Sequence, residues 1–143
     1  MAISQSLCTS FLVELFRGVH DFRTTGDSFK LALYSSSASL SSATTAYTSS
    51  NEVTGTNYTA GGATLTNVNP TSSGTTAYID FADASWAAST ITARGALIYN
   101  DTEAGDPAVC VLDFGSDKSS SASAFTVVFP AAAADSAIIR IGV

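Results

Sequence analysis

The chain has 143 residues, of which 45% are hydrophobic and only 13% are charged, and its formal net charge is −6. This length suits one domain with one core, so we expect a single β-rich domain over residues 1–143. The acidic balance and the scatter of the six basic residues exclude a nucleic-acid footprint, which needs clustered Lys or Arg; these residues are Arg17, Arg23, Lys30, Arg94, Lys118 and Arg140.

Short side chains of Ser, Thr, Ala and Gly take the place of the missing charges. Such side chains lose little rotamer entropy when they are covered, so they suit surfaces that become buried in an assembly. The alternative is a Ser/Thr-rich β domain that is simply neutral. No apolar run approaches the ~18 residues of a membrane span. The first residues lack the charged region of a signal peptide, so we expect synthesis in a cytoplasm and no membrane partner.

One helix is predicted, near the N-terminus. From Ser4 to about Val19 the apolar residues recur every fourth position, which is typical of an amphipathic helix; they are Leu7, Phe11, Leu15 and Val19. Gly18 is placed to end the helix, so we assign residues 1–20 to this element. His20 is expected to cap the helix C-terminus or to face solvent.

The first predicted strand starts at Phe29. Apolar residues there alternate up to Tyr34, which indicates a strand with one buried face. Residues 35–50 are almost all Ser, Thr and Ala, and we predict a long surface loop. This loop is either a flexible excursion or an arm that becomes ordered on a partner.

Residues 51–81 are predicted to form short strands joined by tight turns. Gly61-Gly62, Asn69-Pro70 and Gly74 mark the turns, and a strand over 78–81 follows. Residues 91–99 form a β-like run that Gly95 interrupts, as in a bulge.

The last third of the chain is predicted to hold three more strands. A strand over 108–114 closes at Gly115, and the polar run 116–123 links it to a strand over 125–129. Pro130 ends that strand, the alanines 131–134 are too few for a confident helix, and 137–143 is a β-branched terminal strand.

About seven or eight short strands with regular turn signals indicate an antiparallel β-sandwich or jelly roll. The predicted fold class is therefore mainly β, with one N-terminal amphipathic helix and a β-sandwich over residues 29–143. No helical pattern alternates with the strands, so a parallel α/β sheet is disfavoured.

Catalytic chemistry has few candidates in this sequence. His20 beside Asp21 would need a nucleophile from elsewhere in the fold, and nothing evident would lower the pKa of Cys8 or Cys110. Both cysteines are interpreted as small core residues, although a disulfide between them stays open. No Gly-rich phosphate loop is present, so we expect no enzyme, no catalytic residues and no cofactor.

Two acidic groups could approach a metal ion. Asp101, Glu103 and Asp106 lie in one predicted turn. Asp80 and Asp83 are separated only by Phe81 and Ala82. The turn is the better calcium candidate, but it lacks the last bidentate Glu of an EF-hand loop, and acidic turn residues usually cap turns. We therefore expect no metal site.

The chain resembles small virion structural proteins of tailed bacteriophages. The resemblance covers most of the chain and rests on residues 51–55, 58–65, 91–100, 111–118 and 137–141. It is strongest for head decoration (cement) proteins, and it implies a dimer or trimer in the virion that clamps neighbouring subunits of the major capsid protein. The 35–50 loop and the N-terminal helix are the candidate contacts.

Two other functions stay open. A tail or baseplate component would use the same kind of domain in rings or joints. A carbohydrate-binding β-sandwich for host attachment would need exposed aromatic residues near the acidic turn, and the candidates are Trp86, Tyr58 and Tyr99.

Overall fold

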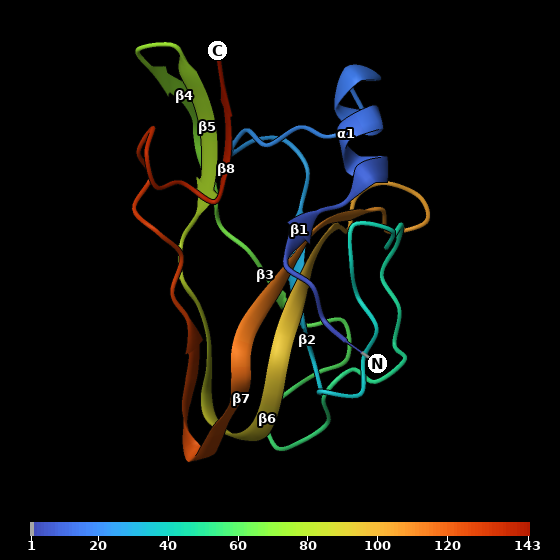
Figure 1. Ribbon diagram of the computed structural model, residues 1–143. Coiled ribbons are helices and arrows are strands. Elements are labelled where there is room, and N and C mark those ends of the chain that lie inside the picture. The colour runs from blue at the N-terminus through green and yellow to red at the C-terminus, as the bar shows by residue number, and fades with distance from the viewer. Residues whose placement is uncertain (1) are drawn as a thin grey trace.

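A computed structural model describes residues 2–143 and shows a mainly β protein with one short helix (Figure 1). Its elements are β1 (Ser6–Leu7), α1 (Thr9–Phe16), β2 (Phe29–Tyr34), β3 (Ala63–Thr64), β4 (Asn67–Ser73), β5 (Thr76–Phe81), β6 (Ala84–Asn100), β7 (Ala108–Val127) and β8 (Ile139–Gly142). The predicted class, antiparallel β with an N-terminal helix, is confirmed.

The strands form two open antiparallel sheets. The larger sheet has the order β1-β7-β6-β2-β3, and the smaller has the order β4-β5-β8. In Figure 1 the smaller sheet and α1 stand side by side at one end of the molecule, with the long strands β6 and β7 below them. The arrangement fits the β-sandwich that the turn spacing predicts.

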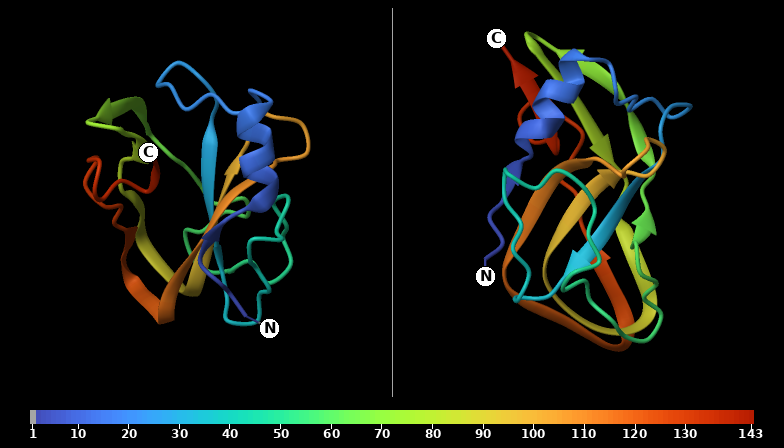
Figure 2. Two further views of the ribbon diagram at one scale, coloured as in Figure 1. Left: turned by 45° about the horizontal axis from the view of Figure 1, so that its top comes forward. Right: turned by 90° about the vertical axis from the view of Figure 1, so that its right-hand side faces the viewer.

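The strands β6 and β7 form a long ribbon that bends back on itself. Figure 2 shows one limb of the ribbon beside β2 and the other limb rising toward the smaller sheet. The bend coincides with register shifts between Trp86 and Ile91 and with positive φ angles at Ala88 and Ala122. Bulges bend the strand that carries them, so these irregularities let one hairpin serve both sides of the sandwich.

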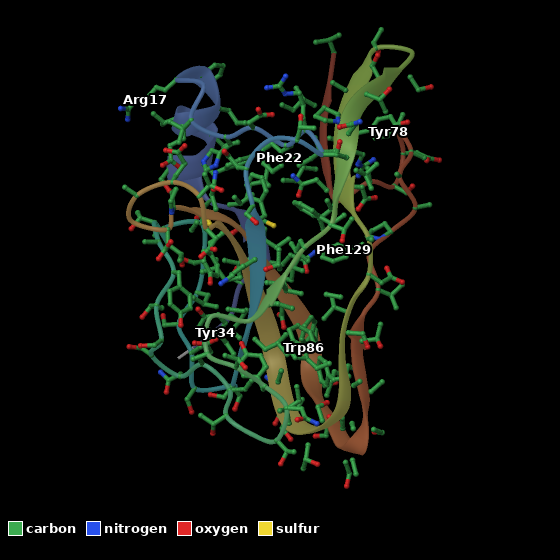
Figure 3. All side chains as sticks on the ribbon, turned by 180° about the vertical axis from the view of Figure 1, so that it is seen from behind. Arg17, Phe22, Tyr34, Tyr78, Trp86 and Phe129 are labelled. Atoms are coloured by element: carbon green, nitrogen blue, oxygen red, sulfur yellow. The ribbon has the colours of Figure 1, made fainter. Side chains whose placement is uncertain are left out.

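Aromatic rings fill the space between the sheets. Phe22 and Phe29 stack with centroids 4.4 Å apart, and Phe81 lies 5.9 Å from Phe29 and 5.8 Å from Phe129. Figure 3 shows Phe22 between α1 and the smaller sheet. These rings belong to a core of buried residues that includes members of both sheets, so both sheets contribute to the same interior.

β2 differs from its predicted pattern. Five of its six residues are buried, so both of its faces are covered and not one alone. Within the sheet β6 and β3 flank β2, and the segment after the 35–50 loop continues the pairing along its edge, since Val53 N donates to Leu33 O at 2.9 Å. A strand buried on both faces loses the alternation that marks a half-solvated strand.

The predicted helix over residues 1–20 is too long. Only Thr9–Phe16 is helical, because Ser6 and Leu7 pair with Val111 and Cys110 as strand β1. The pairing with β7 satisfies backbone groups that a longer helix would otherwise have to satisfy within itself.

Two predicted turns lie inside strands. Asn69 and Pro70 belong to β4, where the register shifts between Val68 and Thr71. Gly115 does not end its strand either, and the polar run 116–123 and the segment 125–127 continue β7. Edge strands tolerate Pro and bulges, because one side of their backbone needs no partner.

The 35–50 loop packs on the rest of the domain and is not a free excursion, while its contact with a partner stays a prediction. Ala38 and Leu40 are buried. Leu40 exchanges backbone hydrogen bonds with Ala2 and Ser4, and Ala108 N donates to Thr45 O at 3.0 Å. The loop is thus held between the N-terminal segment and the start of β7.

Candidate interaction surface

The helix α1 is apolar on both sides. Phe11 is fully buried against the aromatic core, and Leu15, one turn later, is partly buried. Leu12, Val13 and Phe16 are exposed, and Phe16 has 94% of its surface accessible. Because positions three and four residues apart share a helix face, these three side chains form one outward patch. We call Leu12, Val13 and Phe16 the outer face of α1.

A glycine fixes where the helix ends. Gly18 has φ of 69°, which favours glycine, and its N–H donates to Leu15 O at 3.2 Å. Val19 N donates to Glu14 O at 3.1 Å. Together these two bonds form a Schellman motif, which confirms the predicted role of Gly18. The chain then turns back toward the core, and Phe16 is left on the solvent side.

The prediction that His20 caps the helix C-terminus or faces solvent is wrong. Its side chain is fully buried, with Nε2 3.3 Å from Glu14 Oε1 and Nδ1 3.0 Å from Asn100 Nδ2. Asn100 Oδ1 accepts from the backbone N–H groups of Thr102 and Glu103, so its amide nitrogen faces His20. Nδ1 therefore accepts and Nε2 carries the proton that bonds Glu14. This network ties α1 to β6, while Asp21 pairs with Arg23 and not with His20.

A shallow groove separates α1 from the smaller sheet. Its lining is almost entirely apolar and comes from Phe11 and Leu15 on one side and from β5 and β8 on the other; the residues are Phe11, Leu15, Phe22, Pro70, Ala77, Tyr78, Ile79, Ile139 and Ile141. Its volume is about 100 Å³. Small-molecule sites usually exceed about 300 Å³, so this groove suits one or two apolar side chains of a partner.

The two cysteines lie close together in the interior as free thiols. Burial raises the pKa of Cys8 to about 11 and that of Cys110 to about 12. Their interpretation as core residues is confirmed, and no disulfide joins them. A thiol held protonated in this way is a poor nucleophile.

The acidic residues that the sequence singles out do not gather around one point. Within residues 2–143, no group of three potential metal ligands comes together. Asp101 Oδ2 lies 3.5 Å from Lys30 Nζ. Asp80 is buried near the end of β5, and Asp83 follows in the link to β6. Asp83 accepts from Phe129 N at 2.8 Å, so its carboxylate has a structural partner.

The aromatic residues proposed for sugar binding are covered. Trp86 and Tyr99 are buried, and Tyr58 is half-buried with its hydroxyl 2.7 Å from Glu52 Oε1. Trp86 and Tyr99 are therefore not available as stacking platforms for a sugar ring, whereas Tyr58 keeps part of its surface accessible. The carbohydrate-binding hypothesis thus loses two of its three candidate residues, Trp86 and Tyr99.

Glu52 is a residue that sequence reasoning missed. Its two carboxylate oxygens accept from the hydroxyls of Tyr47 and Tyr58 and from Gly61 N, at 2.6 to 2.7 Å. Burial, together with Glu52, raises the pKa of Tyr47 to about 12. In the sequence, the only indication of this cluster is the short spacing between Tyr47, Glu52 and Tyr58. The cluster closes the segment 47–62 over β2, which is a structural role.

Comparisons with protein-family models, with curated proteins and with solved structures found no match for this chain. In the part of the chain that the structure describes, no helix is both long and apolar enough to cross a membrane. The outer face of α1, with its exposed apolar side chains, and the adjoining apolar groove are the strongest candidates for a functional surface.

Proposed function

We propose that this chain is a non-enzymatic structural protein of a phage virion, and that it decorates the head by clamping neighbouring major capsid subunits. The observation that carries the proposal is the outer face of α1. Leu12, Val13 and Phe16 are exposed together on a helix that the protein holds rigidly in place. Contiguous exposed apolar groups mark protein–protein contacts in soluble proteins.

The low charge of the chain supports the same proposal. Only 13% of the residues are charged, and Ser, Thr and Ala are abundant, so large parts of the surface can be covered without desolvating ions. An assembly contact normally buries about 800 Å² on each partner, which is more than one helix face. The adjoining groove and the β8 strand would extend the contact. The choice of the head over the tail rests on the resemblance of the sequence to decoration proteins.

The decisive experiment adds the purified chain to phage heads that lack it and images them by electron microscopy. We expect density over the whole head at two-fold or three-fold positions, with α1 against a capsid subunit. Phe16→Ser should reduce binding by about tenfold or more, because a fully buried aromatic anchor contributes at least 1.4 kcal/mol. Val128→Ser is the matched control, since Val128 is also exposed but lies after β7.

Density confined to the tail vertex would instead favour the tail or baseplate alternative. Equal loss of binding in Phe16→Ser and Val128→Ser would show that α1 is not the contact.

A further inference from the structure

The free strand edges of this fold differ in how well they are protected. Exposed edges invite another chain to add a strand, and proteins blunt them with bulges, charges or Pro. The outer edge of β7 beyond Val111 carries Asp113, Asp117 and Lys118, together with Gly115 at a φ of 79°. The outer edge of β4 carries Pro70 and a register shift.

β8 carries one charge, Arg140, but it has neither the Pro nor the bulge that protects the other edges. It pairs with β5 on one side, and among residues 2–143 no strand lies on its other side. Its residues, Ile139 to Gly142, include two β-branched side chains, no Pro and no bulge. Figure 1 shows β8 as the strand of the smaller sheet nearest α1. The apolar groove lies between α1 and the face of the sheet that carries Ile139 and Ile141, so the free edge of β8 borders this groove.

The register identifies the backbone groups at this edge. Val143 N donates to Thr75 O, and Ile141 and Ile139 stand opposite Ala77 and Ile79. Bonded pairs alternate with non-bonded pairs in an antiparallel ladder, so 139, 141 and 143 bond to β5. Arg140 and Gly142 therefore turn their N–H and C=O groups outward, toward a possible partner strand.

The side chains along β8 indicate what kind of strand would fit. Ile139 and Ile141 line the groove with Phe11 and Leu15. Arg140 is on the opposite face, is exposed, and forms no ion pair within residues 2–143. A cross-strand neighbour of Arg140 is favourable when it is acidic. A second copy that offered its own β8 supplies no acidic residue, and it would place either Arg140 or Gly142 opposite Arg140, so it lacks the charge complementarity of an acidic strand.

We propose that the β8 edge accepts an extended segment of a different protein chain, which has apolar residues facing the groove and an acidic residue beside Arg140. The added strand would bond to Arg140 and Gly142 and would extend the smaller sheet beside β8, with one of its faces on the same side as the groove. Main-chain bonds would supply affinity, and the groove and Arg140 would supply selectivity. This inference rests on the proposed function, because it describes how a partner would bind at the β8 strand and the groove that extend the proposed contact.

The test uses the whole chain and a synthetic peptide of about eight residues, which is a typical strand length. The peptide alternates valine and threonine and carries one central aspartate; a second peptide carries lysine instead. Backbone amide exchange is followed by NMR. At about 1 mM the acidic peptide should protect the Arg140 and Gly142 amides, and the lysine peptide should bind at least about tenfold more weakly.

Two variants separate the backbone contribution from the charge. Arg140→Pro removes an outward N–H and no bond to β5, so it should abolish binding while the fold is kept. Arg140→Ala keeps the N–H, so binding should weaken while protection of Gly142 persists. Equal binding by Arg140→Pro, or no protection at about 1 mM acidic peptide, would overturn the proposal.

These outcomes are independent of the head-binding experiment. A chain that binds heads but not the peptide would refute only the strand addition. A chain that binds the peptide but not heads would refute only the decoration function.

Discussion

Asp80 is a buried carboxyl group whose hydrogen bonds are incomplete. It is 2% exposed, its Oδ1 accepts from Phe81 N at 2.8 Å, and its Oδ2 has no partner within the described residues. Burial raises the pKa of this carboxyl group. An unsatisfied buried polar atom costs about 1–3 kcal/mol, and more when it is charged. We therefore predict that Asp80→Asn raises the free energy of unfolding at pH 7 by about 1–2 kcal/mol.

The pH dependence gives a second, independent check. Because the pKa of Asp80 is higher in the folded state, the native protein binds more protons than the unfolded chain once the pH exceeds the ordinary aspartate range. The contribution of Asp80 to stability therefore falls as the pH rises through that window. The advantage of Asp80→Asn should be largest at pH 7 and should shrink toward pH 4.

Urea unfolding measures both effects, with the fluorescence of Trp86, the single tryptophan, as the probe. Asp135→Asn is the matched control, because Asp135 is exposed, and it should change stability by less than about 0.5 kcal/mol. A loss of more than about 1 kcal/mol in Asp80→Asn would refute the reasoning. So would a gain that stays the same from pH 7 to pH 4.

Three other perturbations test separate parts of the fold. Gly62→Ala should lower the free energy of unfolding by about 3 kcal/mol or more, because an added Cβ would collide with Leu31 O and because φ is +82°. Gly74→Ala is the control: Gly74 has open space around it, so the same urea titration should show a loss of only about 1 kcal/mol. Glu52→Gln should cost about 1–2 kcal/mol by the same assay, because charged hydrogen bonds are lost, and a stability equal to wild type would contradict the role of the cluster. Cys8 and Cys110 should react with a thiol reagent at pH 8 only after denaturation, given their raised pKa values and burial.

The sequence pattern predicted correctly those elements that are determined by residues close to them in the chain. The strand over 29–34, the strand over 78–81 and the bulge near Gly95 are present in the structure. Gly18 ends the helix, as its position predicts. In each case a nearby residue with a strong backbone preference, or a run of β-branched and aromatic side chains, determines the outcome.

The course of β7 through its serines could not be predicted locally. Short polar side chains favour turns, but here they bond across the strand pair: Ser119 to Thr92 at 2.7 Å, and Ser120 to Ser89 at 2.8 Å. Those partners are about thirty residues away, so their effect depends on the hairpin register. Tertiary pairing overrides propensity in such a strand.

The candidate surface was predictable only in part. The apolar stripe indicated the helix and the burial of Phe11, but it does not show which of the remaining apolar residues stay uncovered. The exposure of Phe16 depends on where the chain leaves the helix after Gly18. The free edge of β8 depends on the order of strands in the smaller sheet, which no local pattern specifies.

The bent β6–β7 ribbon also affects the order in which the parts of the protein fold. Its two strands are joined by the short turn 101–107, so the ribbon forms from residues close in the sequence, and such contacts form early in folding. β1 and α1 meet this ribbon from the far end of the chain. We therefore expect the N-terminal segment to dock after the ribbon has formed.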